Sequence, residues 1–129
     1  MTRHLLDTHS FLWFVLDDPK LSTPARSVII NPANDILISP ATYWEMAIKV
    51  GRQKLDLRAT FDEFMDRGIQ GNCFEVLPIE VRHASALTTL PLHHKDPFDR
   101  LLIAQASVEQ IPIVSSDVSL DAYGINRIW

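Results

Sequence analysis

Hydrophobic positions along the 129-residue chain form five short runs that are separated by longer stretches. Each run is bounded by polar or turn-forming residues and is rich in branched side chains, as strands buried on both faces require. The runs are His4–Leu6, Ile36–Ile38, Phe74–Leu77, Ile113–Val114 and Ile125–Trp129. We predict a strand at each of these five positions.

Helix boundaries between the runs are marked by caps, by prolines in the first turn and by terminal glycines. They are Thr23–Pro24, Ser39–Pro40 with Gly51, Thr60–Glu63 with Gly71, and Gly124 at the end of a last short helix. The clearest signal is Asp96-Pro97, because Asp96 is a suitable cap for a helix that runs to about Gln110. Strands that alternate with helices imply right-handed crossovers. We therefore predict one α/β domain over residues 1–129, with three layers and a five-stranded parallel sheet flanked by helices.

Composition limits the kinds of protein that this chain can be. Its hydrophobic content of 47% and mean hydropathy of +0.03 are enough for a packed core. A net charge of −4 argues against binding nucleic acid through bulk positive charge. The single Cys73 cannot form an intramolecular disulfide, and Asp7 and His9 interrupt the apolar stretch Leu5–Leu16, which also lacks a cleavage site for export. We expect a soluble cytoplasmic protein without a membrane segment.

Four acidic residues fall where this architecture turns them toward one end of the sheet. They are Asp7 directly after the first strand, Glu45 in the helix after the second, Asp99 in the helix before the fourth, and Asp117 just past the fourth. Two carboxylates about 5 Å apart repel by roughly 3 kcal/mol at an effective dielectric constant of about 20. Mg²⁺ and Mn²⁺ prefer carboxylate and water oxygens, so a packed cluster of this kind predicts a divalent cation.

Each acid taken singly also has a structural interpretation, as a helix cap or as solvated surface. Asp7 fits that interpretation least, because a charged side chain between two apolar segments is costly to bury without compensation. Of the two acids near the start of the 96–110 helix, Asp96 suits the cap better, and Asp99 is the preferred ligand.

Four segments together carry a family resemblance. They are Leu5–His9, Ser39–Lys49 around Trp44-Glu45, His94–Ala106, and Val114–Asp117. In this order and at these spacings, and with the terminal Trp129, they resemble the PIN-domain ribonucleases, specifically the VapC-like toxins of bacterial toxin–antitoxin systems. The resemblance covers nearly the whole chain.

The resemblance implies an endoribonuclease that depends on Mg²⁺ or Mn²⁺ and a PIN-like fold. It matches Asp7, Glu45, Asp99 and Asp117 to the family's acidic quartet, with the last acid the most variable in the family. It further suggests that the hydroxyls of Thr8 and Ser115 orient the carboxylates; the family often has Thr at the second of these positions. A small antitoxin protein and a homodimer are also implied. An arginine of the antitoxin is well suited to fill a carboxylate cluster, because its guanidinium can donate two hydrogen bonds to the paired oxygens of a carboxylate.

The expected chemistry is hydrolysis of a phosphodiester by water at one or two cations, which leaves a 5′ phosphate and a 3′ hydroxyl. Basic residues near the acids are candidates for contacts with RNA phosphates, although a solvated charged face explains them equally well. The candidates are Lys49, Arg52, Lys54 and Arg100, with Arg58 and Lys95 nearby. The histidines His9, His93 and His94 are alternative general bases, but a metal-bound water needs none.

Three other functions stay open at this point. A phospho-acceptor signalling domain has a similar sheet and an acidic Mg²⁺ site, but it normally pairs two acids after its first strand. A PIN-like domain kept only for binding would have no turnover. A DNA nuclease would use the same carboxylates, because these act on phosphates and do not contact the 2′ hydroxyl.

Overall fold

The protein is built on a single five-stranded parallel sheet. The computed structural model describes residues 2–129, and its strands lie in the order β3-β2-β1-β4-β5. The strands are β1 (Thr2–Leu6), β2 (Asn34–Ile38), β3 (Glu75–Val76), β4 (Ile113–Val114) and β5 (Arg127–Ile128). In the middle of the sheet Leu5 pairs with Leu37 on one side and with Ile113 on the other. The predicted α/β fold with a parallel sheet is confirmed, although β3 and β5 are shorter than predicted.

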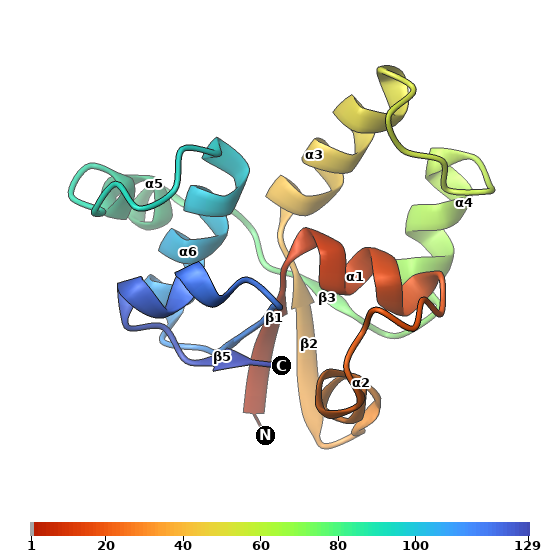
Figure 1. The fold of residues 1–129 in the computed structure, drawn as a ribbon, viewed down its shortest axis with the longest axis horizontal. Helices are drawn as coiled ribbons and strands as arrows, with labels where there is room; N and C mark the ends of the chain where they lie inside the picture. Colours follow the sequence, from red (N-terminus) through yellow and green to blue (C-terminus); the bar gives the residue numbers. More distant parts are fainter. Residues whose placement is uncertain (1) are drawn as a thin grey trace.

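Helices cover both faces of this sheet (Figure 1). They are α1 (Thr8–Val15), α2 (Thr23–Ile30), α3 (Pro40–Gly51), α4 (Phe61–Met65), the π-helical turn η1 (Asp66–Gln70), α5 (Val81–Leu87), α6 (Pro97–Glu109) and the 3₁₀ helix η2 (Val118–Tyr123). Figure 1 shows α1, α2 and α4 on one side of the strands and α5 and α6 on the other. The helix α3 rises from the carboxyl end of β2.

Two hydrophobic clusters, one on each face, hold the layers together. Successive side chains of a strand point to opposite faces, so Leu5 and Leu6 of β1 belong to different clusters and both are fully buried. Leu6 packs with Phe11 of α1 and its neighbours, whereas Leu5 packs with Ile103 of α6. Burial on both faces explains why the strands appear in the sequence as continuous apolar runs.

Most helix starts form as their cap residues predict. The side chains of Ser39, Thr60 and Asp96 accept hydrogen bonds from backbone N–H groups in the first turns of α3, α4 and α6. Gly124 ends η2 with a φ of 70°, a left-handed conformation that suits glycine. These caps place the first turn of α6, and the acids in it, at the carboxyl end of the sheet.

The helix boundaries predicted from the sequence did not include α1, α5 or the π-helical turn η1. The helix α1 begins directly after β1, and its cap is Asp7, which accepts from the N–H of Ser10. An aspartate followed by a helical stretch of eight residues was a usable signal, but the apolar run across Leu5–Leu16 obscured it. The predicted helix after Thr60 changes after five residues into the π-helical turn η1.

The strand order differs from that of the phospho-acceptor signalling domains considered above. Flavodoxin-like signalling domains have the order 2-1-3-4-5. Here β1 lies at the centre between β2 and β4, which is a different connection of the strands. Among residues 2–129, no helix has both the length and the apolar character needed to cross a bilayer.

Candidate functional site

Acidic side chains from four parts of the chain line one pocket at the carboxyl end of the sheet. They include the four predicted from the sequence, Asp7, Glu45, Asp99 and Asp117. The parallel strands cause this meeting, because Asp7 follows β1 and Asp117 follows its neighbour β4, while α3 and α6 bring the other two (Figure 1). Thr8, Lys49 and Asp96 also line the pocket.

Asp7 is held in place by the start of α1. Its Oδ1 accepts from the backbone N–H of Ser10 at 2.8 Å, and the residue caps the helix. Burial raises the pKa of Asp7, although hydrogen bonds from Ser115 and Ser10 oppose the rise. The Asp7 carboxylate is thus anchored at one oxygen and lies in surroundings that penalise its negative charge.

Glu45 is buried in α3, and both of its oxygens have partners. The Thr8 hydroxyl donates to Oε1 at 2.8 Å, and the Lys49 ammonium pairs with Oε2 at 2.8 Å. Lys49 lies one helical turn after Glu45, which is the spacing at which opposite charges meet on a helix. Thr8 therefore contacts Glu45 in this structure, and Lys49, predicted to bind RNA, faces the pocket as the counter-ion of Glu45.

Asp99 is the acid on which repulsion inside the pocket concentrates. Burial, followed by the charges of Asp96, Glu45 and Asp7, raises its pKa to about 6. Three neighbouring carboxylates act on one group, so the acids are close enough to interact electrically. A cation in this pocket would relieve that repulsion.

Asp117 caps η2 and belongs to a hydrogen-bonded network that the sequence did not reveal. Its Oδ1 accepts from the backbone N–H and the hydroxyl of Ser119, and its Oδ2 lies 2.9 Å from Nε2 of His94. Nδ1 of His94 in turn lies 3.1 Å from the Tyr123 hydroxyl. Burial raises the pKa of Asp117, but the bonds from Ser119 and His94 outweigh it and leave that pKa below its ordinary value.

The remaining predicted residues have varied surroundings. Asp96 accepts from the N–H groups of Phe98 and Asp99 through Oδ1, as a cap does, and its side chain also borders the pocket. The buried Ser115 hydroxyl accepts from the backbone N–H of Asp117 at 3.0 Å. Arg100 donates to the carbonyls of Leu90, Pro91 and His94, so its guanidinium holds the loop before α6.

Two of the predicted RNA contacts lie outside the pocket. Arg52 caps the carboxyl end of α3, and Lys54 follows it, both with exposed side chains. The helix α3 extends away from the sheet (Figure 1), and Arg52 and Lys54 follow its last turn, beyond Lys49.

The donor chemistry of the pocket suits a hard divalent cation. All four candidate ligands are carboxylates, and hard ions such as Mg²⁺ and Mn²⁺ prefer oxygen donors. No three of them bring ligand atoms within 4.8 Å of one another in residues 2–129. Mg²⁺ usually keeps several of its own waters, so an open arrangement of acids is compatible with its binding.

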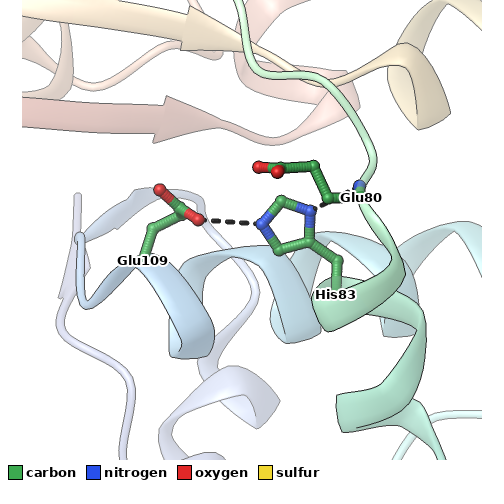
Figure 2. Close-up of side chains that lie close together, drawn as sticks. All are labelled: Glu80, His83 and Glu109. Atoms are coloured by element: carbon green, nitrogen blue, oxygen red, sulfur yellow. Dashed lines mark hydrogen bonds and ion pairs between the residues drawn. The ribbon is translucent and has the colours of Figure 1, made fainter.

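A tighter group of side chains that could bind a metal lies outside the pocket and consists of Glu80, His83 and Glu109 (Figure 2). Their charges are compensated by hydrogen bonds and ion pairs within the protein. Nδ1 of His83 accepts from the N–H of Glu80, so Nε2 carries the proton that faces Glu109 at 2.9 Å. Arg82 pairs with both glutamates, and Arg3 with Glu109. The His83 hydrogen bond, with the nearby arginines, lowers the pKa of Glu109. We interpret this group as a structural link between α5, α6 and the start of β1.

The sequence matches the model of the family described as PIN domain over residues 4–126. No curated protein matches it. Among solved structures, VapBC2 from Rickettsia felis bound to a DNA fragment from its promoter is similar, with a TM-score of 0.71, 15% identity, and 98% of this chain and 97% of that chain covered.

Two further solved structures, of FitAB and FitAcB, are also similar in fold. FitAB bound to an IR36 DNA fragment has a TM-score of 0.62 and 19% identity, covering 96% of this chain and 92% of that chain. FitAcB from Neisseria gonorrhoeae has a TM-score of 0.61 and 19% identity, covering 96% and 95%.

Proposed function

Because the chain belongs to the PIN domain family, whose members are nucleases, we propose that it is a metal-dependent endoribonuclease acting as the toxin of a toxin–antitoxin pair. The observation that carries the proposal is the meeting of Asp7, Glu45, Asp99 and Asp117 around one pocket. These four acids are proposed to hold Mg²⁺ or Mn²⁺. The bound cation would supply an activated water and neutralise charge on the phosphate.

In this proposal, neighbouring groups of the protein position the carboxylates of the four acids. The Thr8 hydroxyl fixes one oxygen of Glu45, and the start of α1 fixes one oxygen of Asp7. Ser115 positions the backbone of Asp117. No side-chain nucleophile is required, and Cys73 lies exposed outside the residues that line the pocket.

An antitoxin partner and a homodimer are further parts of the proposal. The similar structures are those of VapBC2 and FitAB bound to DNA, which supports an antitoxin as the partner of this chain. We propose that a basic residue of the antitoxin enters the acidic pocket. A homodimer in solution would have twice the 14.7 kDa mass of one chain, which light scattering measures directly.

Cleavage assays test the enzymatic part of the proposal. Labelled RNA and DNA of the same sequence are incubated with the protein in Mg²⁺ or Mn²⁺, and again in EDTA, alongside Asp7→Asn and the control Glu80→Gln. We expect RNA to be cut with metal by the natural protein and by Glu80→Gln, with 5′ phosphates on the products. Cutting that persists in EDTA and in Asp7→Asn would exclude this mechanism, and absence of cutting by the natural protein would favour a domain that only binds.

A further inference from the structure

One aromatic side chain of α3, the helix that carries Glu45, is largely exposed. Trp44 of α3 is 60% exposed, and it is the only aromatic among the large hydrophobic side chains that are exposed in residues 2–129. It directly precedes Glu45 in the chain. Tryptophan exposes a large apolar surface to water at this position, and such residues are enriched where one molecule binds another.

The indole ring of Trp44 packs against a second aromatic ring, which comes from α6. Its centroid lies 5.9 Å from that of Phe98, with the planes at 71°, which is an edge-to-face pair. Phe98 directly precedes Asp99 in the first turn of α6, and it packs on the core cluster behind it. The pair therefore bridges α3 and α6 at the residues that precede Glu45 and Asp99, and the contact with Phe98 restrains the Trp44 ring.

We propose that Trp44, supported by Phe98, stacks on an unpaired base of a single-stranded RNA whose neighbouring phosphate lies in the acidic pocket. The inference rests on the proposed function and extends it to the class of substrate. Every base has an aromatic face, so stacking on Trp44 is tolerant of sequence but requires the base to be unstacked from its neighbours. Bases inside a duplex are already stacked, so duplex RNA is a poor ligand for this platform.

The charges around the pocket leave the bases of an RNA, and not its phosphates, as the part that could supply affinity beside the cation. The net charge of −4 gives no general attraction for a polyanion. The Lys49 ammonium in the pocket is paired with Glu45, and the Arg100 guanidinium is bonded to backbone carbonyls. Stacking provides affinity that depends little on positive charge, and Trp44 and Phe98 directly precede the pocket acids Glu45 and Asp99 in the chain.

Binding measurements with substituted proteins test the proposal. The probe is a fluorescein-labelled single-stranded RNA of roughly 12 nucleotides and mixed sequence, a length that spans a typical single-strand site. Anisotropy is measured for the natural protein, Trp44→Ala and Trp44→Phe with Ca²⁺ in place of Mg²⁺, because Ca²⁺ also binds carboxylate oxygens, and gel electrophoresis confirms that the probe stays intact. The control Val81→Ala shortens an exposed apolar side chain at the start of α5.

We expect Trp44→Ala to weaken binding of the single strand about 10-fold at both low and high salt, because stacking is not ionic. Trp44→Phe should retain most of the affinity, Val81→Ala all of it, and a duplex of the same RNA should show no dependence on Trp44. Equal affinity of Trp44→Ala and the natural protein for the single strand would overturn the proposal, and would leave a protein partner as the occupant. Failure of the natural protein to bind the probe would overturn it too.

The same samples separate this inference from the proposed function. Metal-dependent cutting by the natural protein together with unchanged binding by Trp44→Ala would contradict the platform alone. Weakened binding by Trp44→Ala without any cutting by the natural protein would support the platform and contradict the nuclease.

Discussion

At the scale of the residue, Asp99 carries the clearest sign that the acids of the pocket repel one another. An aspartate in water titrates near 4, whereas burial and three neighbouring carboxylates move the pKa of Asp99 to about 6. A protein that used these acids only as surface or caps would gain by spreading them apart. Their convergence is explained if a cation normally shares the pocket with them.

Asp99→Asn should stabilise the metal-free protein at pH 7 by roughly 1 kcal/mol, after allowance for solvent screening of a partly exposed group. The pKa of Asp99 is raised on folding, so its ionised form opposes folding above pH 6 and this penalty disappears as the pH falls. Urea unfolding in EDTA should therefore show the largest gain at pH 7 to 8 and little gain near pH 4. A gain that is equal at both ends, or a loss at pH 7, would contradict the repulsion that we describe.

How far the sequence could predict the site depends on the residue. Asp7, Glu45, Asp99 and Asp117 were predictable, because parallel strands bring their carboxyl ends to one edge. The bond between His94 and Asp117 was not, because the two residues lie 23 positions apart and meet only through the path of a loop. The engagement of Arg100 with three carbonyls was hidden for the same reason, since a sequence shows the charge and not the partner.

At the scale of the element, the helix starts place the chemistry. Caps at the starts of α1 and α6 are acids that also border the pocket, Asp7 and Asp96. Helix N-termini carry partial positive charge, which favours carboxylates at these positions. The same residues therefore fix the helices and supply negative charge to the site.

Two substitutions of Asp96 separate its structural role from a role as a metal ligand. Asp96→Ala removes the acceptor for the N–H groups of Phe98 and Asp99 and should cost about 1 kcal/mol of stability. Asp96→Asn keeps an oxygen that can cap the helix. It should have the stability and the Mn²⁺ affinity of the natural protein, as measured by urea unfolding and calorimetry. If Asp96→Asn folds normally but loses Mn²⁺, then Asp96 is a ligand in its own right.

The turn η1 tests the packing that supports α1. A Cβ on Gly68 would lie 2.8 Å from the end of the buried Phe11 ring, so Gly68→Ala should destabilise the protein by about 1–3 kcal/mol. Gly51, the last residue of α3, has nothing within 4 Å of the same position, and Gly51→Ala should be neutral or stabilising by about 0.5 kcal/mol. Equal unfolding midpoints for the two variants would contradict the close approach of η1 to α1.

Element existence was more predictable than element form. Caps and periodic apolar runs mark α3 and α6 clearly, because both signals are local. The change from α4 to a π-helical turn was not predictable, since it depends on how Gly68 lies against α1. The helix α1 was missed because its residues are apolar on most sides, which is typical of a helix packed between other layers.

At the scale of the whole molecule, the proposed function requires an acidic protein to bind an acidic polymer. A net charge of −4 implies that any attraction for RNA is local. It would come from the pocket with its cation, from the Trp44–Phe98 pair and from exposed basic side chains such as Arg52 and Lys54. Divalent ions change the sign of the pocket, so affinity for RNA should rise when Mg²⁺ is added.

Reversing the charges of Arg52 and Lys54 together should weaken RNA binding and its dependence on salt. Each lost phosphate contact reduces the slope of log affinity against log salt by about 0.7 for single strands, so two contacts give about 1.4. The measurement is anisotropy across a salt series, with Lys20→Glu, an exposed residue between α1 and α2, as the control. An unchanged slope in the double variant would mean that these residues form only a solvated face.

Direct binding of Mn²⁺ tests the central claim, that the four acids at the carboxyl end of the sheet form a cation site. Electron paramagnetic resonance counts free Mn²⁺ in the presence of the natural protein, Asp7→Asn, Asp99→Asn and Glu80→Gln. We predict that the natural protein and Glu80→Gln bind Mn²⁺ equally, whereas Asp7→Asn and Asp99→Asn lose most of the affinity. Undiminished binding by both aspartate variants, or loss of binding in Glu80→Gln, would contradict the account.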